Sequence, residues 1–383
     1  MPITAGIRAF AAACSLALAY TPAASADVKG FNAAMKKGDI QTAAIEAAST
    51  WTTWDKADPD TALLAREFGF VSLLAGKNAE AEMFGKFLVE EGATLKTPDD
   101  QPQTSAVLYR AGQFRQKPNS DNREALMAAL TTRASSPGID MTSVVAWEAL
   151  FGAAWSAGNW DNAIQDATQA AEFMKRDEKG VLARRRSAEL FVAAARFLRD
   201  RNKATTIRYG SYNALADVHD AIARDIDAVS PGAAKQLWPL KWRANAWVNS
   251  AESYIRSGYE QTGSLINTNV KSRDLVDPRT SQLPPDESGL PLCDGKFEGK
   301  SLQYPGSKEY KGLVGSVIAR LETDVTGKVI KTEVLAAVPS DAFAASVVAT
   351  TNTWRLVPAK GVDRSTCRLN TRDRTFSVTF TIG

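Results

Sequence analysis

The sequence predicts a multidomain protein in which an α-helical, repeat-like domain is followed by a small α+β domain. Three observations support this fold class. The first two thirds of the chain show helical spacing of apolar residues and a weak repeat. A stretch rich in proline, serine and aspartate then interrupts the pattern. Beyond it, apolar and polar side chains alternate along segments joined by a tight turn. We expect a signal peptide at 1–26, the helical domain at 27–261, a linker at 262–291 and the α+β domain at 292–383.

The composition is that of an ordinary folded protein. The chain has 383 residues, of which 44% are hydrophobic and 23% are charged, and its net charge is +3. This length is enough for two or three domains. The small net charge and the lack of a basic stripe interleaved with aromatic residues give no reason to expect a nucleic-acid partner.

The first residues have the layout of a secretory signal. Arg8 precedes an apolar run, Phe10–Tyr20, and a small-residue site of the A-x-A type follows at Ala24–Ala26. The run is shorter than the about 20 residues that span a bilayer. We therefore expect cleavage before Asp27 and export of the mature chain. The alternatives are an uncleaved inner-membrane anchor and a lipoprotein modified at Cys14.

The cysteines agree with export. Removal of the signal leaves one pair, Cys293 and Cys367. In an oxidising compartment such a pair often forms a disulfide, which is the prediction here; the alternative is two free thiols. The sequence has no CxxC motif, so neither a redox motif nor a zinc knuckle is supported.

The helical region contains a weak repeat. A glycine is followed five residues later by alanine, and four residues after that by another small residue. Glycine ends a helix readily, and small residues spaced by four let a neighbouring helix pack closely. The pattern occurs at Gly38, Gly76 and Gly158, with a degenerate copy at Ser120.

This spacing loosely resembles that of tetratricopeptide repeats, with Trp147, Phe151 and Trp155 partly filling the aromatic positions. The alternative is a non-repeating helical domain with alanine-rich contacts. Further helices are predicted at 181–200, 214–229 and 238–258. We expect Arg184–Arg186 to lie on a solvated helix face; the alternative is a charged binding site.

The last region predicts the order β-β-α-β. Residues 317–325 alternate as a half-buried strand, Gly327 supplies the turn, and 329–335 returns. Ser340 is a good N-cap for the helix that follows, which places Phe343, Val347, Thr351 and Trp354 on one face. A final strand is predicted at 374–382, with aromatic and aliphatic side chains on one face and Ser and Thr on the other.

These residues also carry a resemblance. Tyr304–Pro305, Gly312–Gly315, Gly327–Val329 and Trp354–Ala359 occur in this order before the alternating final strand. The series resembles the carboxy-terminal domain of TonB-type energy transducers, and it covers residues from about 300 to 383.

The resemblance implies a periplasmic domain that binds other envelope proteins. In that family an extended peptide from an outer-membrane receptor pairs with the last strand of the domain. Such pairing satisfies the open backbone groups of an edge strand. The alternative is a strand that completes a core or pairs with a second copy. The implied partner-binding residues are Arg374, Phe376, Val378, Phe380 and Ile382.

The sequence shows no catalytic signature, so we expect no enzyme, no cofactor and no metal. The single histidine, His219, lies beside helical acids and is expected at the surface. Gly299–Ser301 imitates a phosphate loop, but position 294 is Asp where that motif requires glycine.

We interpret the chain as a periplasmic scaffold that binds proteins through its terminal strand. A TonB-type transducer has an amino-terminal membrane helix and a long spacer rich in proline and lysine. Here a cleavable signal and a helical domain stand in those places. The alternatives are a membrane-anchored transducer for outer-membrane transport, if the signal is uncleaved, and an envelope hydrolase with a binding module.

Overall fold

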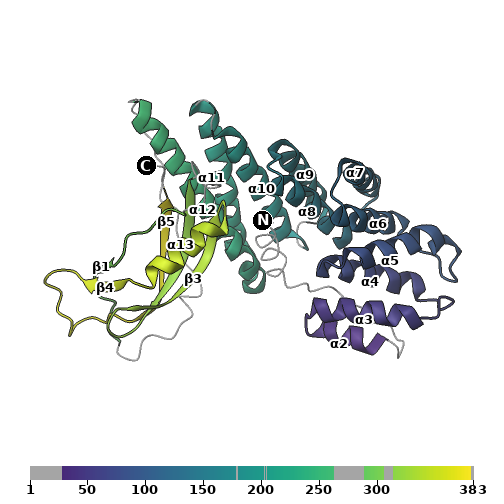
Figure 1. The fold of residues 1–383 in the computed structure, drawn as a ribbon, viewed down its shortest axis with the longest axis horizontal. Coiled ribbons are helices and arrows are strands. Elements are labelled where there is room, and N and C mark those ends of the chain that lie inside the picture. Colours follow the sequence, from purple (N-terminus) through teal and green to yellow (C-terminus); the bar gives the residue numbers. More distant parts are fainter. Residues whose placement is uncertain are drawn as a thin grey trace. The chain divides into compact units, whose positions relative to one another are not determined.

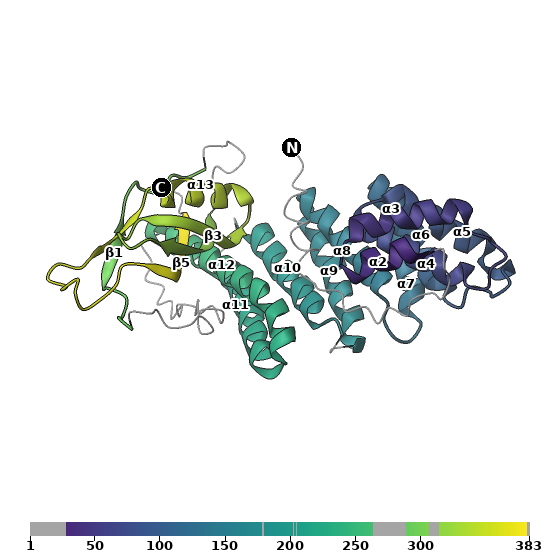
Figure 2. The ribbon, with the colours of Figure 1, turned by 90° about the horizontal axis from the view of Figure 1, so that it is seen from below.

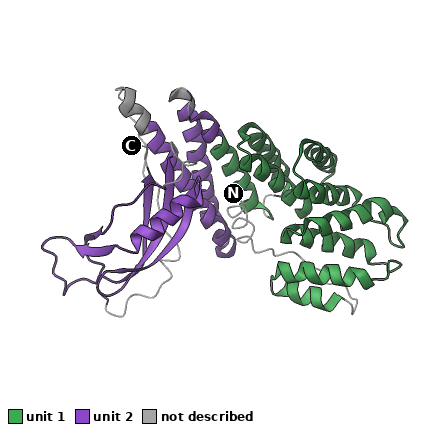
Figure 3. Ribbon diagram, viewed as in Figure 1, with its two compact units in different colours: residues 1–195 green, residues 196–383 purple. Residues whose placement is uncertain are grey.

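A computed structural model of the chain describes residues 28–177, 180–201, 203, 205–262, 289–305 and 314–380. The chain divides into two compact units, residues 1–195 and residues 196–383 (Figure 3). The predicted signal peptide, most of the predicted linker and Ile382 lie outside the described residues. A mostly helical first part and a small sheet near the end agree with the predicted fold class at that coarse level.

Unit 1 consists of consecutive helices that pack against their neighbours in sequence (Figure 1). Its elements are α2 (Lys29–Lys36), α3 (Ile40–Thr53), α4 (Thr61–Ala75), α5 (Asn78–Glu91), η2 (Gly92–Thr94), α6 (Pro102–Gln116), α7 (Ser120–Ala134), α8 (Met141–Ser156), α9 (Trp160–Met174) and η3 (Lys175–Asp177). Helix α10 (Leu182–Asp200) runs across the division between the units.

The repeat glycines lie at turns between helices, and the alanines that follow them lie in helix contacts, as the sequence predicts. The three repeat glycines have positive φ and lie between α2 and α3, α4 and α5, and α8 and α9. Glycine has no Cβ to clash in this conformation, so the helix ends there without strain. The alanines that follow them, Ala43, Ala81 and Ala163, are buried. In the degenerate copy, Leu126 and Leu130 are buried instead.

Helices α5 and α6 approach so closely that two glycines are needed between them. A Cβ on Gly85 would collide with the backbone nitrogen of Tyr109. A Cβ on Gly112 would lie 2.5 Å from the backbone nitrogen of Glu82. Contacts this short are repulsive, so the two backbones can approach only where the side chain is a hydrogen.

Aromatic side chains fill the amino-terminal half of the core of unit 1. Phe31 from α2 and Phe68 from α4 meet edge to face at 4.8 Å between ring centroids. Trp51 from α3 contacts Phe84 from α5 at 5.2 Å. Such pairs contribute about 0.5–1.5 kcal/mol each beyond the burial of their area, so they fix the order in which these helices stack.

Unit 2 joins two long helices to the strands. Its elements after α10 are α11 (Thr205–Ala228), α12 (Pro231–Thr262), β1 (Gly295–Glu298), β2 (Gly315–Thr323), β3 (Val329–Val338), α13 (Asp341–Thr351), β4 (Arg355–Pro358) and β5 (Thr371–Phe380). Helices α11 and α12, which the sequence assigns to the helical domain, therefore belong to the same compact unit as the sheet.

The strands form a three-stranded antiparallel sheet of order β3-β2-β5 and a two-stranded sheet of β1 and β4. The predicted hairpin is β2–β3, and Gly327 in its turn has φ of 81°. The Asp324 carboxylate accepts hydrogen bonds from the backbone N–H groups of Thr326 and Lys328. Ser340 caps α13 as predicted, by accepting from the N–H of Ala342.

Both faces of the three-stranded sheet carry a helix, with α13 on one face and α12 on the other (Figures 1 and 2). Phe343 of α13 contacts Phe380 at 5.3 Å between ring centroids. On the opposite face, Asn249 of α12 donates to the Ser377 hydroxyl at 2.8 Å. Successive residues of a strand point to opposite faces, so even- and odd-numbered residues of β5 meet different helices. The sequence predicts only the helix after β3.

Two polar predictions in the helical region are wrong. Arg184 is not solvated, because its guanidinium binds both carboxylate oxygens of Glu148 at 2.7 and 2.6 Å. His219 is buried rather than on the surface, with its Nδ1 3.0 Å from the carboxylate of Asp220. In both cases a neighbouring acid compensates a polar group that packing removes from water.

A buried carboxyl in α4 makes unit 1 sensitive to pH. Burial raises the pKa of Glu67 to about 7, although the charge of Arg66 opposes the shift. One carboxyl oxygen of Glu67 is buried and has no hydrogen-bond partner among the described residues. The folded state therefore holds a proton on this group more tightly than the unfolded state does.

We predict that the close approach of α5 and α6 makes Gly85→Ala destabilising by about 1–3 kcal/mol, the usual cost of overpacking. Gly210→Ala in α11 is the control, because a Cβ there meets nothing within 4 Å. Hydrogen exchange followed by mass spectrometry should show faster exchange in α5 and α6 of the first variant only. Unchanged exchange in both helices would contradict the packing described.

We predict that Glu67 makes the free energy of unfolding fall as the pH rises from about 4.5 to about 7. Over this window the folded state binds more protons than the unfolded state, so raising the pH favours unfolding. Glu67→Gln should flatten this slope and stabilise the protein by about 1 kcal/mol at pH 8, allowing for solvent screening.

The measurement is urea unfolding at several pH values. The matched control is Glu90→Gln, which removes an exposed carboxylate from α5. An identical pH slope for wild type and Glu67→Gln would show that this carboxyl is ionised in the folded state.

Candidate functional site

The candidate site is the outer edge of β5, the side of the strand that faces away from β2. Strand β5 is last in the order β3-β2-β5, and its inner side pairs with β2 from Gly315↔Phe380 to Thr323↔Thr371. Among the described residues no strand pairs with its outer side. In a strand, N–H and C=O groups alternate between the two sides, so this edge offers backbone donors and acceptors.

Four of the five predicted binding residues share one face of β5, the face that α13 covers. Phe380 is buried in the core beneath α13 with Val317 and Phe343. Phe376 and Val378 are half-buried and pack against the same core. Arg374 pairs with Leu321 in the β2–β5 register and is half-buried. These apolar side chains therefore complete a core, and a partner would meet mainly the backbone of the strand.

The opposite face of β5 contacts α12, although Ser377 on that face stays exposed. Besides the Asn249–Ser377 bond, Ser250 of α12 donates to the carbonyl of Val314 at 3.0 Å. Arg243 of α12 is half-buried, and the desolvation lowers its pKa to about 10, while the charge of Asp341 at the start of α13 opposes the change. The Ser and Thr face therefore interacts with α12, which the sequence pattern did not reveal.

The residues that carry the TonB-like pattern have structural roles here. Tyr304 meets Phe343 and Phe380 edge to face. A Cβ on Gly315 would collide with the ring of Phe343. Trp354 donates from its indole nitrogen to the carbonyl of Lys300 at 2.8 Å. Each motif residue described thus holds the sheet, α13 and the segment before β2 together.

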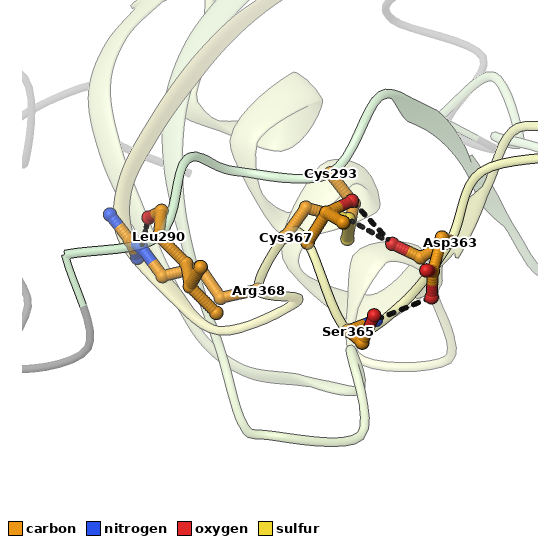
Figure 4. Close-up of a disulfide and its surroundings, with 7 residues drawn as sticks. Leu290, Cys293, Asp363, Ser365, Cys367 and Arg368 are labelled. Atoms are coloured by element: carbon orange, nitrogen blue, oxygen red, sulfur yellow. Dashed lines mark hydrogen bonds between the residues drawn. A yellow bond between two sulfur atoms is a disulfide. The ribbon is translucent and has the colours of Figure 1, made fainter.

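A disulfide links the segment before β1 to the loop before β5. Cys293 and Cys367 are bonded, as predicted, and both are buried. Around them, the backbone N–H of Cys293 donates to the carbonyl of Arg368 at 2.9 Å. The Arg368 side chain donates to the carbonyl of Leu290 at 3.0 Å (Figure 4). The disulfide thereby anchors the start of β5 to the β1–β4 sheet.

The short strands β1 and β4 were missed by the sequence analysis. Each spans four residues, and they pair from Gly295↔Pro358 to Glu298↔Arg355. Phe297 of β1 and Trp354, the residue before β4, connect this sheet to β5. Phe297 stacks on Trp354 at 6.0 Å, and Trp354 lies 5.7 Å from Phe376. Only the alternation of Lys296, Phe297 and Glu298 hinted at a strand, and three residues are too few to establish a period.

The chain leading into β5 is basic. Residues 355–374 contain six basic and two acidic side chains, a net charge of +4. One of the acids, Asp363, accepts a hydrogen bond from the backbone N–H of Ser365, which lowers its pKa. The guanidinium of Arg374 lies 5.5 Å from the centre of the Phe297 ring. The chain that leads into β5 therefore carries a net positive charge, whereas the first half of β5 itself has two arginines and one aspartate.

The described residues contain neither a membrane-spanning helix nor a cluster of metal-binding side chains. None of their helices combines the length and the hydropathy that crossing a membrane requires. Nor do these residues bring together three histidine, cysteine or acidic side chains in a group suited to a metal ion.

Comparisons of the chain with protein-family models, with curated proteins and with solved structures gave no match. The TonB-like resemblance therefore depends on the residue pattern alone and stays a prediction.

We predict that the disulfide contributes about 4 kcal/mol to the stability of unit 2, because it closes a loop of 74 residues in the unfolded chain. Cys367→Ser should lower the midpoint of urea unfolding of this unit. Labelling of the denatured, unreduced protein with a thiol reagent, followed by peptide mapping, should leave Cys293 and Cys367 unmodified. Label on either residue would contradict the bond.

Proposed function

We propose that this protein is a periplasmic scaffold whose TonB-like terminal unit binds envelope proteins by pairing an extended segment with the outer edge of β5. The observation that carries the proposal is the end position of β5, whose outer side no described strand occupies. A strand that adds to such an edge gains main-chain hydrogen bonds along its length.

The covered faces of the sheet favour the edge over any other part of this unit. Helix α13 covers one face and α12 the other, so neither face offers a broad apolar surface (Figure 2). The outer edges of the two end strands, β3 and β5, remain as possible binding surfaces. At the other end, the start of β3 already interacts with the chain entering β4, because the N–H of Val329 donates at 3.0 Å to the carbonyl of Trp354, the residue before β4. The outer edge of β5 is thus the more open of the two.

The length of β5 suits a specific interaction. It spans ten residues, from Thr371 to Phe380. Natural edges this long usually carry charged side chains that hinder indiscriminate pairing. Here Arg372 is exposed and Arg374 is half-buried at one end. In a parallel, in-register pair of two β5 strands these charges would lie opposite their own copies and repel. Residues 375–380 carry no charge and remain open to a complementary strand.

Unit 1 suits the second part of the scaffold role. Consecutive helical hairpins present side chains on an extended surface, and four large apolar residues are exposed on α3, α4 and α5: Ile45, Leu63, Met83 and Val89. Exposed apolar residues rimmed by polar ones are common where proteins meet. A second partner that binds these residues would be linked, through the same chain, to whatever β5 holds.

We predict that proline at one of two adjacent positions, Val378 or Thr379, abolishes partner capture without unfolding the domain. Neighbouring residues direct their N–H groups to opposite sides of a strand, so one of the prolines affects the β2 ladder and the other affects the outer edge. Thermal unfolding identifies the edge variant as the one whose midpoint is nearly unchanged.

The functional readout is capture of envelope proteins by cross-linking in the periplasm followed by mass spectrometry. The edge variant should lose the partners that wild type captures. The matched control is Ser365→Ala in the loop before β5, which should keep them. Equal capture by the folded edge variant and by wild type would refute pairing at β5.

A further inference from the structure

We propose that α12 is a releasable cover of the three-stranded sheet: it undocks from the sheet together with α11, while α13 and the strands stay folded. This conformational device goes beyond the proposed function and does not depend on which segment pairs with β5. It follows from the difference between the two faces of the sheet and between the two sides of α12 (Figures 1 and 2).

The face of the sheet beneath α13 is apolar and closely packed. Val317 and Ala319 of β2 have no exposed surface there, and they share a core with Phe343 of α13 and Phe380 of β5. The ring of Tyr304 meets both phenylalanines edge to face, at 5.7 and 6.3 Å between centroids. Because burial of apolar area stabilises a contact in proportion to that area, α13 is held firmly.

The opposite face of the sheet is more polar. Residues two apart along a strand share a face, which here carries Ser316 and Ile318 of β2, Ala336 and Val338 of β3, and Ser377 and Thr379 of β5. Half of these side chains bear a hydroxyl and none is aromatic. Small side chains of this kind bury little apolar area, so this face holds a helix less firmly than the other.

The structure records hydrogen bonds between α12 and this face. Asn249 donates to the hydroxyl of Ser377 at 2.8 Å, and Ser250 donates to the carbonyl of Val314 at 3.0 Å. The amide of Asn249 also donates to Oδ1 of Asn245 at 3.0 Å. When such groups separate, water takes the place of each partner, so these bonds add little to the free energy of docking.

Other polar atoms at this face are enclosed without a partner. Among the described residues, Nδ2 of Asn245, Oγ of Ser316 and Oγ1 of Thr375 have no hydrogen-bond partner. Asn245 and Ser316 are only 1% and 0% exposed, and Thr375 lies on the same face of β5 as Ser377. A buried donor or acceptor left without a partner destabilises the closed state. Undocking of α12 gives these groups access to water and so removes that penalty.

The other side of α12 is held by apolar contacts. Trp247 and Tyr254 both meet the ring of Phe197 of α10, at 6.2 and 5.7 Å between centroids. Leu215 and Ile222 of α11, which packs against α12, have no exposed surface. When unit 2 opens, the weaker contact separates first, so α12 stays with α10 and α11 and leaves the sheet.

The test is thiol labelling of engineered cysteines along β2 in the full chain. The background is C14A, in which the other two cysteines are bonded to each other and only the engineered thiol is free. S316C and I318C place probes beneath α12, and V317C and A319C place matched probes beneath α13. All four native side chains have no exposed surface, so a water-soluble maleimide reacts only after opening. Labelling rates are measured by mass spectrometry at several urea concentrations below the unfolding transition.

We expect the rates to alternate along this single strand. S316C and I318C should label at least about a hundredfold faster than V317C and A319C, because undocking needs less free energy than unfolding of the unit. The rates of the first pair should depend weakly on urea, since undocking exposes little surface. Those of the second pair should follow the steep urea dependence of global unfolding.

Two further variants change the docking contact itself. N249A removes the hydrogen bond to Ser377 and should speed labelling of S316C about fivefold. T375V removes an enclosed hydroxyl and should slow this labelling about fivefold. Neither variant should change the ratio of the V317C rate to the rate of global unfolding.

Two results would overturn the inference. Equal rates with equal urea dependence at all four positions would show that α12 leaves the sheet only when the whole unit unfolds or that β2 opens as a whole. Shifts of all four rates by the same factor in N249A and T375V would assign their effect to general stability. Each face has two probes, so the comparison survives if one cysteine variant fails to fold.

Discussion

Strand β2 is the element on which unit 2 depends, because it is enclosed on every side. Its two edges pair with β3 and β5, and its two faces lie beneath α13 and α12. Val317, Ile318 and Ala319 in its centre have no exposed surface. Burial of successive side chains from Ser316 to Ala319, in place of alternate ones, is what a strand covered on both faces requires. The neighbouring strands acquire their positions from this one.

That arrangement also explains why β5 has a mixed character. Its inner edge and both of its faces contribute to the fold through β2, α13 and α12, while its outer edge does not. In the residues implied by the TonB-like resemblance, side chain and backbone therefore have different roles. Phe376, Val378 and Phe380 fasten the strand to the core, and the backbone beside them offers the pairing groups. A rigid edge of this kind loses little entropy on binding.

The sequence was informative where local chemistry determines structure. Alternating residues and Gly327 predicted the β2–β3 hairpin, Ser340 predicted the start of α13, and the pairing of Cys293 with Cys367 followed from cysteine count. The repeat glycines predicted where the helices of unit 1 turn, because positive φ is a property of single residues.

It was less informative where distant segments meet. The pattern of α12 indicated that one helix face is buried, but not that the sheet buries it. Strands β1 and β4 carry no period because each has only four residues. His219 was expected at the surface because acids flank it, whereas packing of its helix decides its burial. At the candidate edge, the strand was predicted, but its end position in the sheet and the aromatic support of Arg374 depend on contacts between remote parts of the chain.

The covalent link between Cys293 and Cys367 has a mechanical consequence. Any protein attached to β5 that moves relative to this one applies tension to the strand and to the loop before it. Without the disulfide, residues 359–370 would have to extend before the tension reached the β1–β4 sheet. With the disulfide, the shortest covalent path from β5 to that sheet runs from Cys367 through the two sulfur atoms to Cys293. Only the few residues between Cys367 and β5 then need to extend before a force on the strand reaches the β1–β4 sheet.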